Sequence, residues 1–109
     1  MSNRKDRKDA PWYQQGDVTI KPVADVPAGA QPSDSNVLRE GEATGHAHRA
    51  VAGDVRLFLG DGRLFMRAPS GTEVRHEEHD VVRVPPGVYE IGGVREYDHF
   101  AEEAQEVVD

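Results

Sequence analysis

Apolar residues occur along this chain in short runs, separated by glycine and proline at intervals of about 8–12 residues, which is typical of short β-strands. Few runs are long enough for a helix, and several alternate with polar residues. We therefore predict an all-β fold, either a small barrel or a sandwich. The runs predict strands over residues 17–21, 37–44, 81–84, 88–91 and 94–97, an extended segment over 46–52, and a bulge or turn at Gly92-Gly93.

The clearest local pattern is a β-hairpin over residues 55–67, whose apolar flanks of equal length surround Asp61-Gly62. Aspartate and glycine both tolerate a positive φ, as the two central residues of a type I′ turn require. Both faces of this hairpin are apolar. We therefore expect it to lie centrally in a sheet or to pack against a second protomer.

The two ends of the chain differ from the middle. Residues 1–11 are charged and lack periodicity, which predicts a disordered N-terminal arm. Residues 12–97 are predicted to form the β-domain. Residues 98–109 carry apolar residues at helical spacing behind Asp98, a suitable N-cap, and predict a short acidic C-terminal helix.

Composition narrows the class of protein. With 109 residues, 37% of them hydrophobic and 6% aromatic, the chain is expected to form one domain with a thin core. Such cores are often completed by a metal ion or by oligomerisation. The absence of cysteine excludes disulfides, thiolate zinc sites and a cysteine nucleophile.

Charge and hydropathy bear on partners and location. The net charge of −7 argues against nucleic-acid binding, which needs phosphate-neutralising cations. No apolar run reaches membrane-spanning length, and the polar first residues do not resemble a signal peptide. We therefore expect a cytoplasmic protein without nucleic-acid or membrane partners.

The concentrated chemical signal is a pair of histidine clusters. His46 and His48 point to the same face if their segment is a strand, because side chains alternate along a strand. His76 and His79 meet at i and i+3 if their segment forms a turn or one helical turn. If that segment is extended, His76 pairs with Glu78 instead.

These four histidines predict a metal site, provided that the two segments meet in space. Imidazole is a good ligand for divalent transition metals, of which zinc is favoured here. An open coordination position would permit metal-assisted hydrolysis, with Glu77 or Glu78 as general base. Arg49 would then neutralise developing negative charge. The competing interpretation is that the histidines are solvated or hydrogen-bonded to neighbouring acids.

One resemblance is to the cupins. His46-Ala47-His48 is similar to the HxH of a cupin strand, and Pro85-Pro86-Gly87 resembles the later PxG turn. The expected glutamate after His48 is missing, and Val88-Tyr89-Glu90 stands where the cupin pattern has a histidine. The resemblance therefore implies architecture at most.

A second resemblance covers most of residues 14–98. The strings GEATGHAHR, HEEHD and PPGVYEI-x-x-x-REYD resemble those of a family of small uncharacterised bacterial and phage-associated proteins. This resemblance implies no activity. Three hypotheses for the function therefore stand. The first is a metal-binding β-domain, and the second is a non-enzymatic module that forms a homo-oligomer or docks on a partner protein. The third is a barrel that binds a small ligand without chemistry, which would need a concave apolar pocket.

Overall fold

The computed structural model describes residues 11–41 and 44–93, and within these ranges the chain forms β-strands and no helix. No described segment therefore has the length and apolar character of a membrane-crossing helix. The strands are β1 (Tyr13–Gln15), β2 (Val18–Val23), β3 (Gln31–Ser33), β4 (Val37–Glu40), β5 (Ala47–Ala50), β6 (Arg56–Gly60), β7 (Arg63–Ala68), β8 (Thr72–His76), β9 (His79–Val84) and β10 (Gly87–Gly93).

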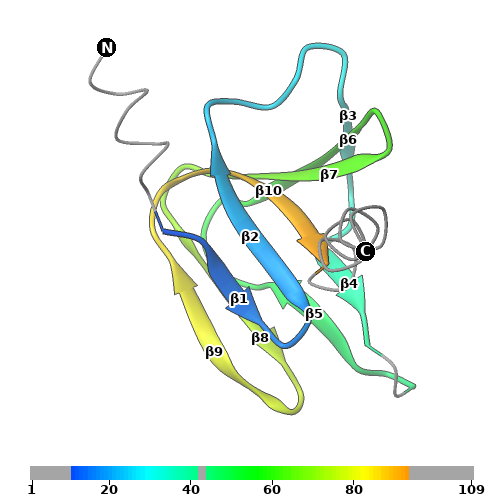
Figure 1. Ribbon diagram of the computed structural model, residues 1–109, viewed down its shortest axis with the longest axis vertical. Coiled ribbons are helices and arrows are strands. Elements are labelled where there is room, and N and C mark those ends of the chain that lie inside the picture. Colours follow the sequence, from blue (N-terminus) through cyan, green and yellow to red (C-terminus); the bar gives the residue numbers. More distant parts are fainter. Residues whose placement is uncertain (1–10, 42–43, 94–109) are drawn as a thin grey trace, which may run out of the picture.

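The strands form two antiparallel sheets (Figure 1). The larger sheet has the order β1-β2-β10-β7-β6-β3, and the smaller has the order β4-β5-β8-β9. The all-β prediction is confirmed, and among the described strands the sheets remain separate rather than closing into a barrel. The predicted C-terminal helix lies outside the described residues, as does the predicted N-terminal arm apart from Pro11.

One hydrophobic core is shared by the two sheets. Ile20 of β2 and Met66 of β7 enter it from the larger sheet, and Val74 of β8 enters it from the smaller sheet. Strand β8 shows the expected alternation, because Thr72 and Val74 are buried while Arg75 is exposed. This alternation fixes which face of β8 is turned to the core.

The predicted hairpin is confirmed as β6 and β7. Asp61 and Gly62 have φ angles of 55° and 71°, as a type I′ turn requires. Strand β7 lies between β6 and β10, and β6 lies between β7 and β3. The two apolar faces of the hairpin therefore agree with an inner position in the sheet.

Strands β2 and β10 continue past the ends predicted for them. Strand β2 runs through Pro22 to Val23, because β1 pairs with it only as far as Ile20 and leaves an unpaired outer edge that accommodates a proline. Gly92 and Gly93 form no turn and continue β10 opposite β2. A Cβ on Gly93 would lie 2.5 Å from the Arg39 guanidinium, so the glycine makes room for that side chain.

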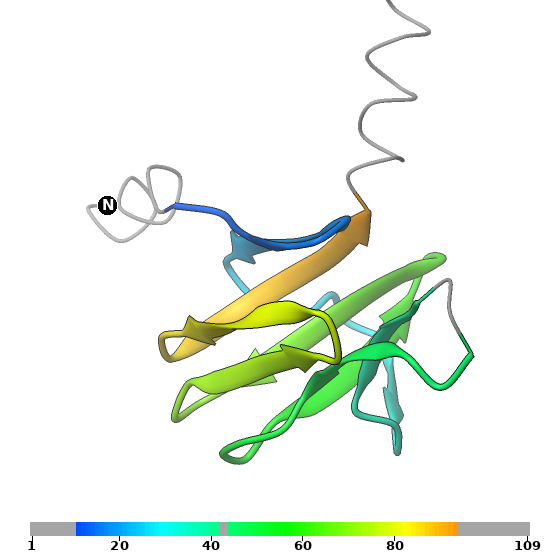
Figure 2. The same cartoon turned by 90° about the horizontal axis from the view of Figure 1, so that it is seen from below.

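The arrangement of the smaller sheet positions the histidines. Gly45, with φ 83°, lies in the turn between β4 and β5, so the predicted strand over 37–44 is shorter than expected. Strand β5 pairs with β8, and β8 continues into β9 through a tight turn. Figure 2 shows the resulting β8–β9 hairpin, in yellow and yellow-green, of which β9 contacts β1 of the larger sheet.

Candidate metal centre

The HEEH string forms the turn of the β8–β9 hairpin. His76 ends β8, His79 begins β9, and the two residues are directly opposite each other in the ladder. Opposed residues of an antiparallel pair project from the same face. Their ring centroids lie 4.6 Å apart. The turn alternative of the sequence analysis is therefore the one that the chain adopts.

The HAH string is brought to the same place by the pairing of β5 with β8. Arg49 pairs with Arg75, so the residues just before Arg49 lie beside the end of β8. The His48 ring centroid is 4.3 Å from that of His76 and 5.7 Å from that of His79. The His46 ring centroid lies 5.6 Å from that of His76. The structure thus brings all four histidines together.

Three residues in this cluster have ligand atoms close enough to share an ion. One nitrogen each of His46 and His76 and one carboxylate oxygen of Glu77 all lie within 4.8 Å of one another. Ligand atoms about 2.0–2.1 Å from a tetrahedral ion lie roughly 3.4 Å apart. Side chains would therefore move by about an ångström on binding. His46 and Glu77 are both partly exposed to solvent and have room to do so.

Glu77 is held by two contacts. The Ala47 N–H donates to Oε1 at 3.0 Å, and the Arg49 guanidinium lies 3.3 Å from Oε2. The hydrogen bond from Ala47 lowers the pKa of Glu77, with smaller contributions from His46 and Arg49. A carboxylate held ionised in this way suits a ligand better than a general base, which needs a pKa near the working pH. Arg49 is engaged with Glu77 rather than directed to an external anion.

Glu78 contacts two of the histidines. Its N–H donates to Nδ1 of His76 at 3.0 Å, and its Oε2 lies 3.6 Å from Nδ1 of His46. Because Nδ1 of His76 is an acceptor, the neutral ring carries its proton on Nε2. Binding of an ion through Nε2 would move this proton and break a hydrogen bond worth about 1 kcal/mol.

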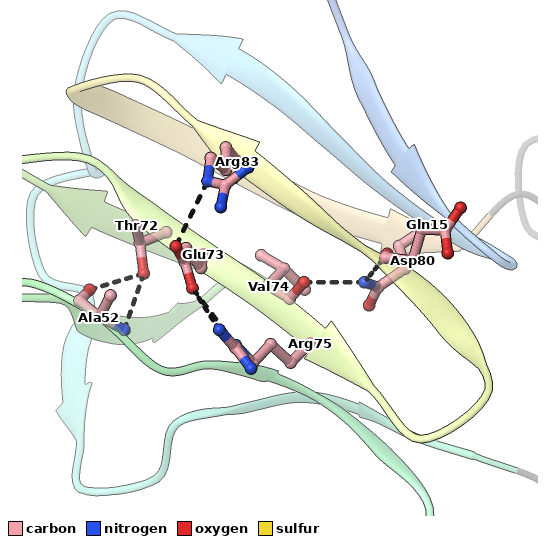
Figure 3. A network of polar contacts seen from close by, with 8 residues as sticks. All are labelled: Gln15, Ala52, Thr72, Glu73, Val74, Arg75, Asp80 and Arg83. Atoms are coloured by element: carbon pink, nitrogen blue, oxygen red, sulfur yellow. Dashed lines mark hydrogen bonds and ion pairs between the residues drawn. The ribbon is translucent and has the colours of Figure 1, made fainter.

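His48 is oriented by a residue that the sequence analysis missed. The amide nitrogen of Gln15, which is 3% exposed, donates to the carbonyl oxygens of Val74 and Asp80 at 2.8 and 2.9 Å (Figure 3). Its Oε1 therefore accepts the hydrogen bond from Nδ1 of His48, 2.8 Å away. Nothing local marks Gln15, because its role depends on strands about sixty residues further along the chain.

Burial lowers the pKa of His48 below its ordinary value of 6.5, and the neighbouring His76 adds to this shift. Because the unfolded chain binds this proton more readily, stability is lost as the pH falls below about 6.5. We expect urea unfolding in EDTA to give a smaller free energy of unfolding at about pH 5.5 than at about pH 7.5, a range above the titration of most carboxylates. The decrease should be smaller in His48→Gln; equal stability of the wild-type protein at both pH values would contradict the expectation.

Two glycines let the backbone approach the rings. A Cβ on Gly16 would lie 2.7 Å from Nε2 of His79, and a Cβ on Gly41 would lie 3.1 Å from Nε2 of His76. Gly16 also has a φ of 57°, which favours glycine. The main chain therefore borders the cluster at the β1–β2 turn and at the end of β4.

A separate hollow of about 510 Å³ lies at the other end of the β8–β9 hairpin, lined by residues 52–53, 70–73 and 83–86. Its two charged residues, Glu73 and Arg83, are already paired at 3.4 Å. Thr72 there bonds to the backbone of Ala52 at 2.7 Å (Figure 3). Its lining includes no histidine, so the histidine cluster remains the stronger candidate site.

The fold and the cluster together define an all-β domain of two antiparallel sheets that carries histidines and carboxylates at one end of its smaller sheet. The chain belongs to the family described as Domain of unknown function (DUF8820), whose model matches residues 14–93. This confirms the resemblance to a family of small uncharacterised domains, and all four clustered histidines lie within the matched range. No curated protein and no solved structure matches the chain.

Proposed function

We propose that this protein is a metal-binding domain that holds a divalent transition-metal ion, zinc above others, between His46, His76 and Glu77. The supporting observation is the mutual approach of their three ligand atoms to within 4.8 Å. Imidazole nitrogens with one carboxylate oxygen form a donor set that zinc accepts. Three protein ligands would leave one coordination position open to water.

The ion would stabilise one end of the smaller sheet. His46 lies between the β4–β5 turn and β5, whereas His76 and Glu77 lie at the β8–β9 turn. A shared ion would link these two turns, and a ligand that binds only the folded chain adds about 2.7 kcal/mol at a hundred times its Kd. Such a link suits a domain with a thin core.

Water activation is the further chemistry that the open position would allow. Glu78 is then the better placed base, because its side chain is mostly exposed and lies beside His46, whereas both oxygens of Glu77 are engaged. A bound ion would lower the pKa of a coordinated water, and Glu78 would be the neighbouring base that accepts its proton in hydrolysis.

The proposal is tested by titrating zinc into the full, untagged chain after treatment with a chelator. We expect saturable binding and a rise in Tm. Loss of a residue that hydrogen-bonds to a metal ligand typically weakens metal binding by roughly 10–100-fold. Glu77→Gln alters a ligand itself and should weaken zinc binding by at least that factor. Glu73→Gln is the matched control, because Glu73 also lies on the β8–β9 hairpin and pairs with arginines.

In this titration the control variant should bind zinc as the wild-type chain does. Less than about a tenth of an equivalent of bound metal, with no change in Tm, would overturn the proposal.

Self-association is a second candidate, which the exposed apolar side chains favour. Among the described residues, Trp12, Val51, Leu59 and Val81 each leave between 39% and 53% of their surface exposed. Association would cover such side chains and extend a small core. Sedimentation over a range of concentrations decides this: a monomer throughout would remove the candidate.

A further inference from the structure

We propose that the cluster has a second, inner cation position between Nε2 of His48 and Oδ1 of Asp17, with Gln15 as the residue that orients His48. The inference rests on the proposed function, since it extends the same cluster from one ion to two. It is carried by contacts in which neither His46 nor Glu77 takes part.

The first contact determines which ring nitrogen of His48 carries the lone pair. Gln15 can only accept through Oε1, because both hydrogens of its amide are directed to carbonyl oxygens. The proton of neutral His48 is therefore on Nδ1, and Nε2 carries the lone pair. Metal-bound histidines usually have this arrangement, in which the other ring N–H is donated to an oxygen acceptor. His48 is 3% exposed, so water has little access to compete with that bond.

The second contact places a carboxylate opposite that lone pair. Oδ1 of Asp17 lies 3.7 Å from Nε2 of His48, whereas Oδ2 of Asp17 lies 3.6 Å from Nε of Arg39. An unprotonated Nε2 and a carboxylate oxygen are both acceptors and cannot bond directly. Their separation is close to the roughly 3.4 Å between two ligands of one tetrahedral ion. A cation between them would satisfy both atoms.

His79 also lies beside the β1–β2 turn. The position of a Cβ on Gly16, the residue before Asp17, lies 2.7 Å from Nε2 of His79 and 3.2 Å from Cε1 of His48. The two rings are stacked, with centroids 5.7 Å apart and an interplanar angle of 19°, so their in-plane lone pairs do not converge on one point in this arrangement. His79 is therefore a neighbour of the pair formed by His48 and Asp17, whose imidazole and carboxylate are donors suited to zinc, cobalt or nickel.

The inner and outer positions use different ligands, and His76 of the outer position lies near both pairs of side chains. The His76 ring lies 4.3 Å from that of His48 and 5.6 Å from that of His46. Variants of Asp17 and Glu77 can therefore address the two positions separately. Asp17 is partly exposed, so Asp17→Asn keeps the shape of the side chain at little cost in packing.

The experiment measures bound Zn²⁺ per full chain by equilibrium dialysis and metal analysis, for the wild-type protein, Asp17→Asn, Glu77→Gln and the control Asp54→Asn. Asp54 is exposed and lies beyond the far end of β5. We expect two equivalents for the wild-type protein and for Asp54→Asn. We expect one equivalent for Asp17→Asn and one for Glu77→Gln.

The other outcomes separate the two proposals. One equivalent that Glu77→Gln abolishes and Asp17→Asn leaves unchanged would overturn the inner position and keep the proposed function. One equivalent that either substitution abolishes would indicate a single shared ion and would also overturn the inner position. One equivalent that depends on Asp17 alone would support the inner position and overturn the outer ligand set. No binding would overturn both.

A measurement on the wild-type protein keeps the inference testable should a variant fail to fold. Long-range ¹H–¹⁵N spectra distinguish protonated from unprotonated ring nitrogens of each histidine. We expect Nε2 of His48 to be unprotonated without metal and to shift when Zn²⁺ is added. A protonated Nε2, or an Nε2 that zinc does not move, would overturn the inner position.

Discussion

Leu57→Ala is expected to lower the free energy of unfolding by about 3–4 kcal/mol, because it removes a fully buried side chain from a core that has few large members. Leu57 is 1% exposed and lies opposite Met66, another fully buried residue. The surrounding strands are hydrogen-bonded on both sides of β6 and cannot collapse freely into the space left behind. With a total stability of roughly 5–15 kcal/mol, this loss is a large fraction.

The same strand supplies the control for this substitution. Leu59 lies two residues further along β6 and is 53% exposed. Leu59→Ala should therefore cost less than about 1 kcal/mol. Urea unfolding of both variants in EDTA makes the comparison, and similar losses for Leu57→Ala and Leu59→Ala would contradict the placement of the core.

Gln15→Leu is expected to cost about 3 kcal/mol or more, because three hydrogen-bonding groups, two of them buried and one partly buried, lose their partner while the volume is kept. These groups are the carbonyl oxygens of Val74 and Asp80 and the Nδ1–H of His48. Each unsatisfied buried group costs about 1–3 kcal/mol. The amide also ties β1 to the β8–β9 hairpin, so the variant should open the cluster as well as destabilise the fold.

Gln14→Leu is the matched control for this second substitution. The side chain of Gln14 is exposed and its amide donates only locally, to the carbonyl oxygen of Gly16. We expect a change within about 0.5 kcal/mol. Denaturant unfolding without metal, followed by zinc titration of any variant that folds, measures both effects. If both variants lost an equally small amount of unfolding free energy, the buried amide of Gln15 would not be stabilising the fold.

The sequence predicts those features of the fold that depend on interactions between neighbouring residues. The Asp61-Gly62 turn was predictable, because two adjacent residues that tolerate positive φ define a hairpin by themselves. The meeting of His76 with His79 was one of two stated alternatives, decided by the tight turn at Glu77-Glu78. In each case the deciding interactions span only a few residues.

Features set by distant contacts could not be predicted from the sequence. The pairing of β5 with β8 joins segments about 25 residues apart, so the convergence of the histidine pairs could only be stated as a condition. Gly92-Gly93 was interpreted as a bulge or turn, because nothing nearby indicates that Arg39 occupies the space over the strand. The roles of Gln15 and Asp17 depend on the other sheet and leave no local trace.

The position of β10 has a consequence for how the chain reaches this fold. The last strand described, Gly87–Gly93, lies inside the larger sheet, and Gly93 pairs with Val18. During synthesis β2 and β7 therefore each keep one unpaired hydrogen-bonding edge until residues 87–93 have left the ribosome. Closing so long a loop is slow, and unpaired edges are where nascent chains aggregate. A chain that stops before Gly87 would lack the strand that joins the two halves of its larger sheet.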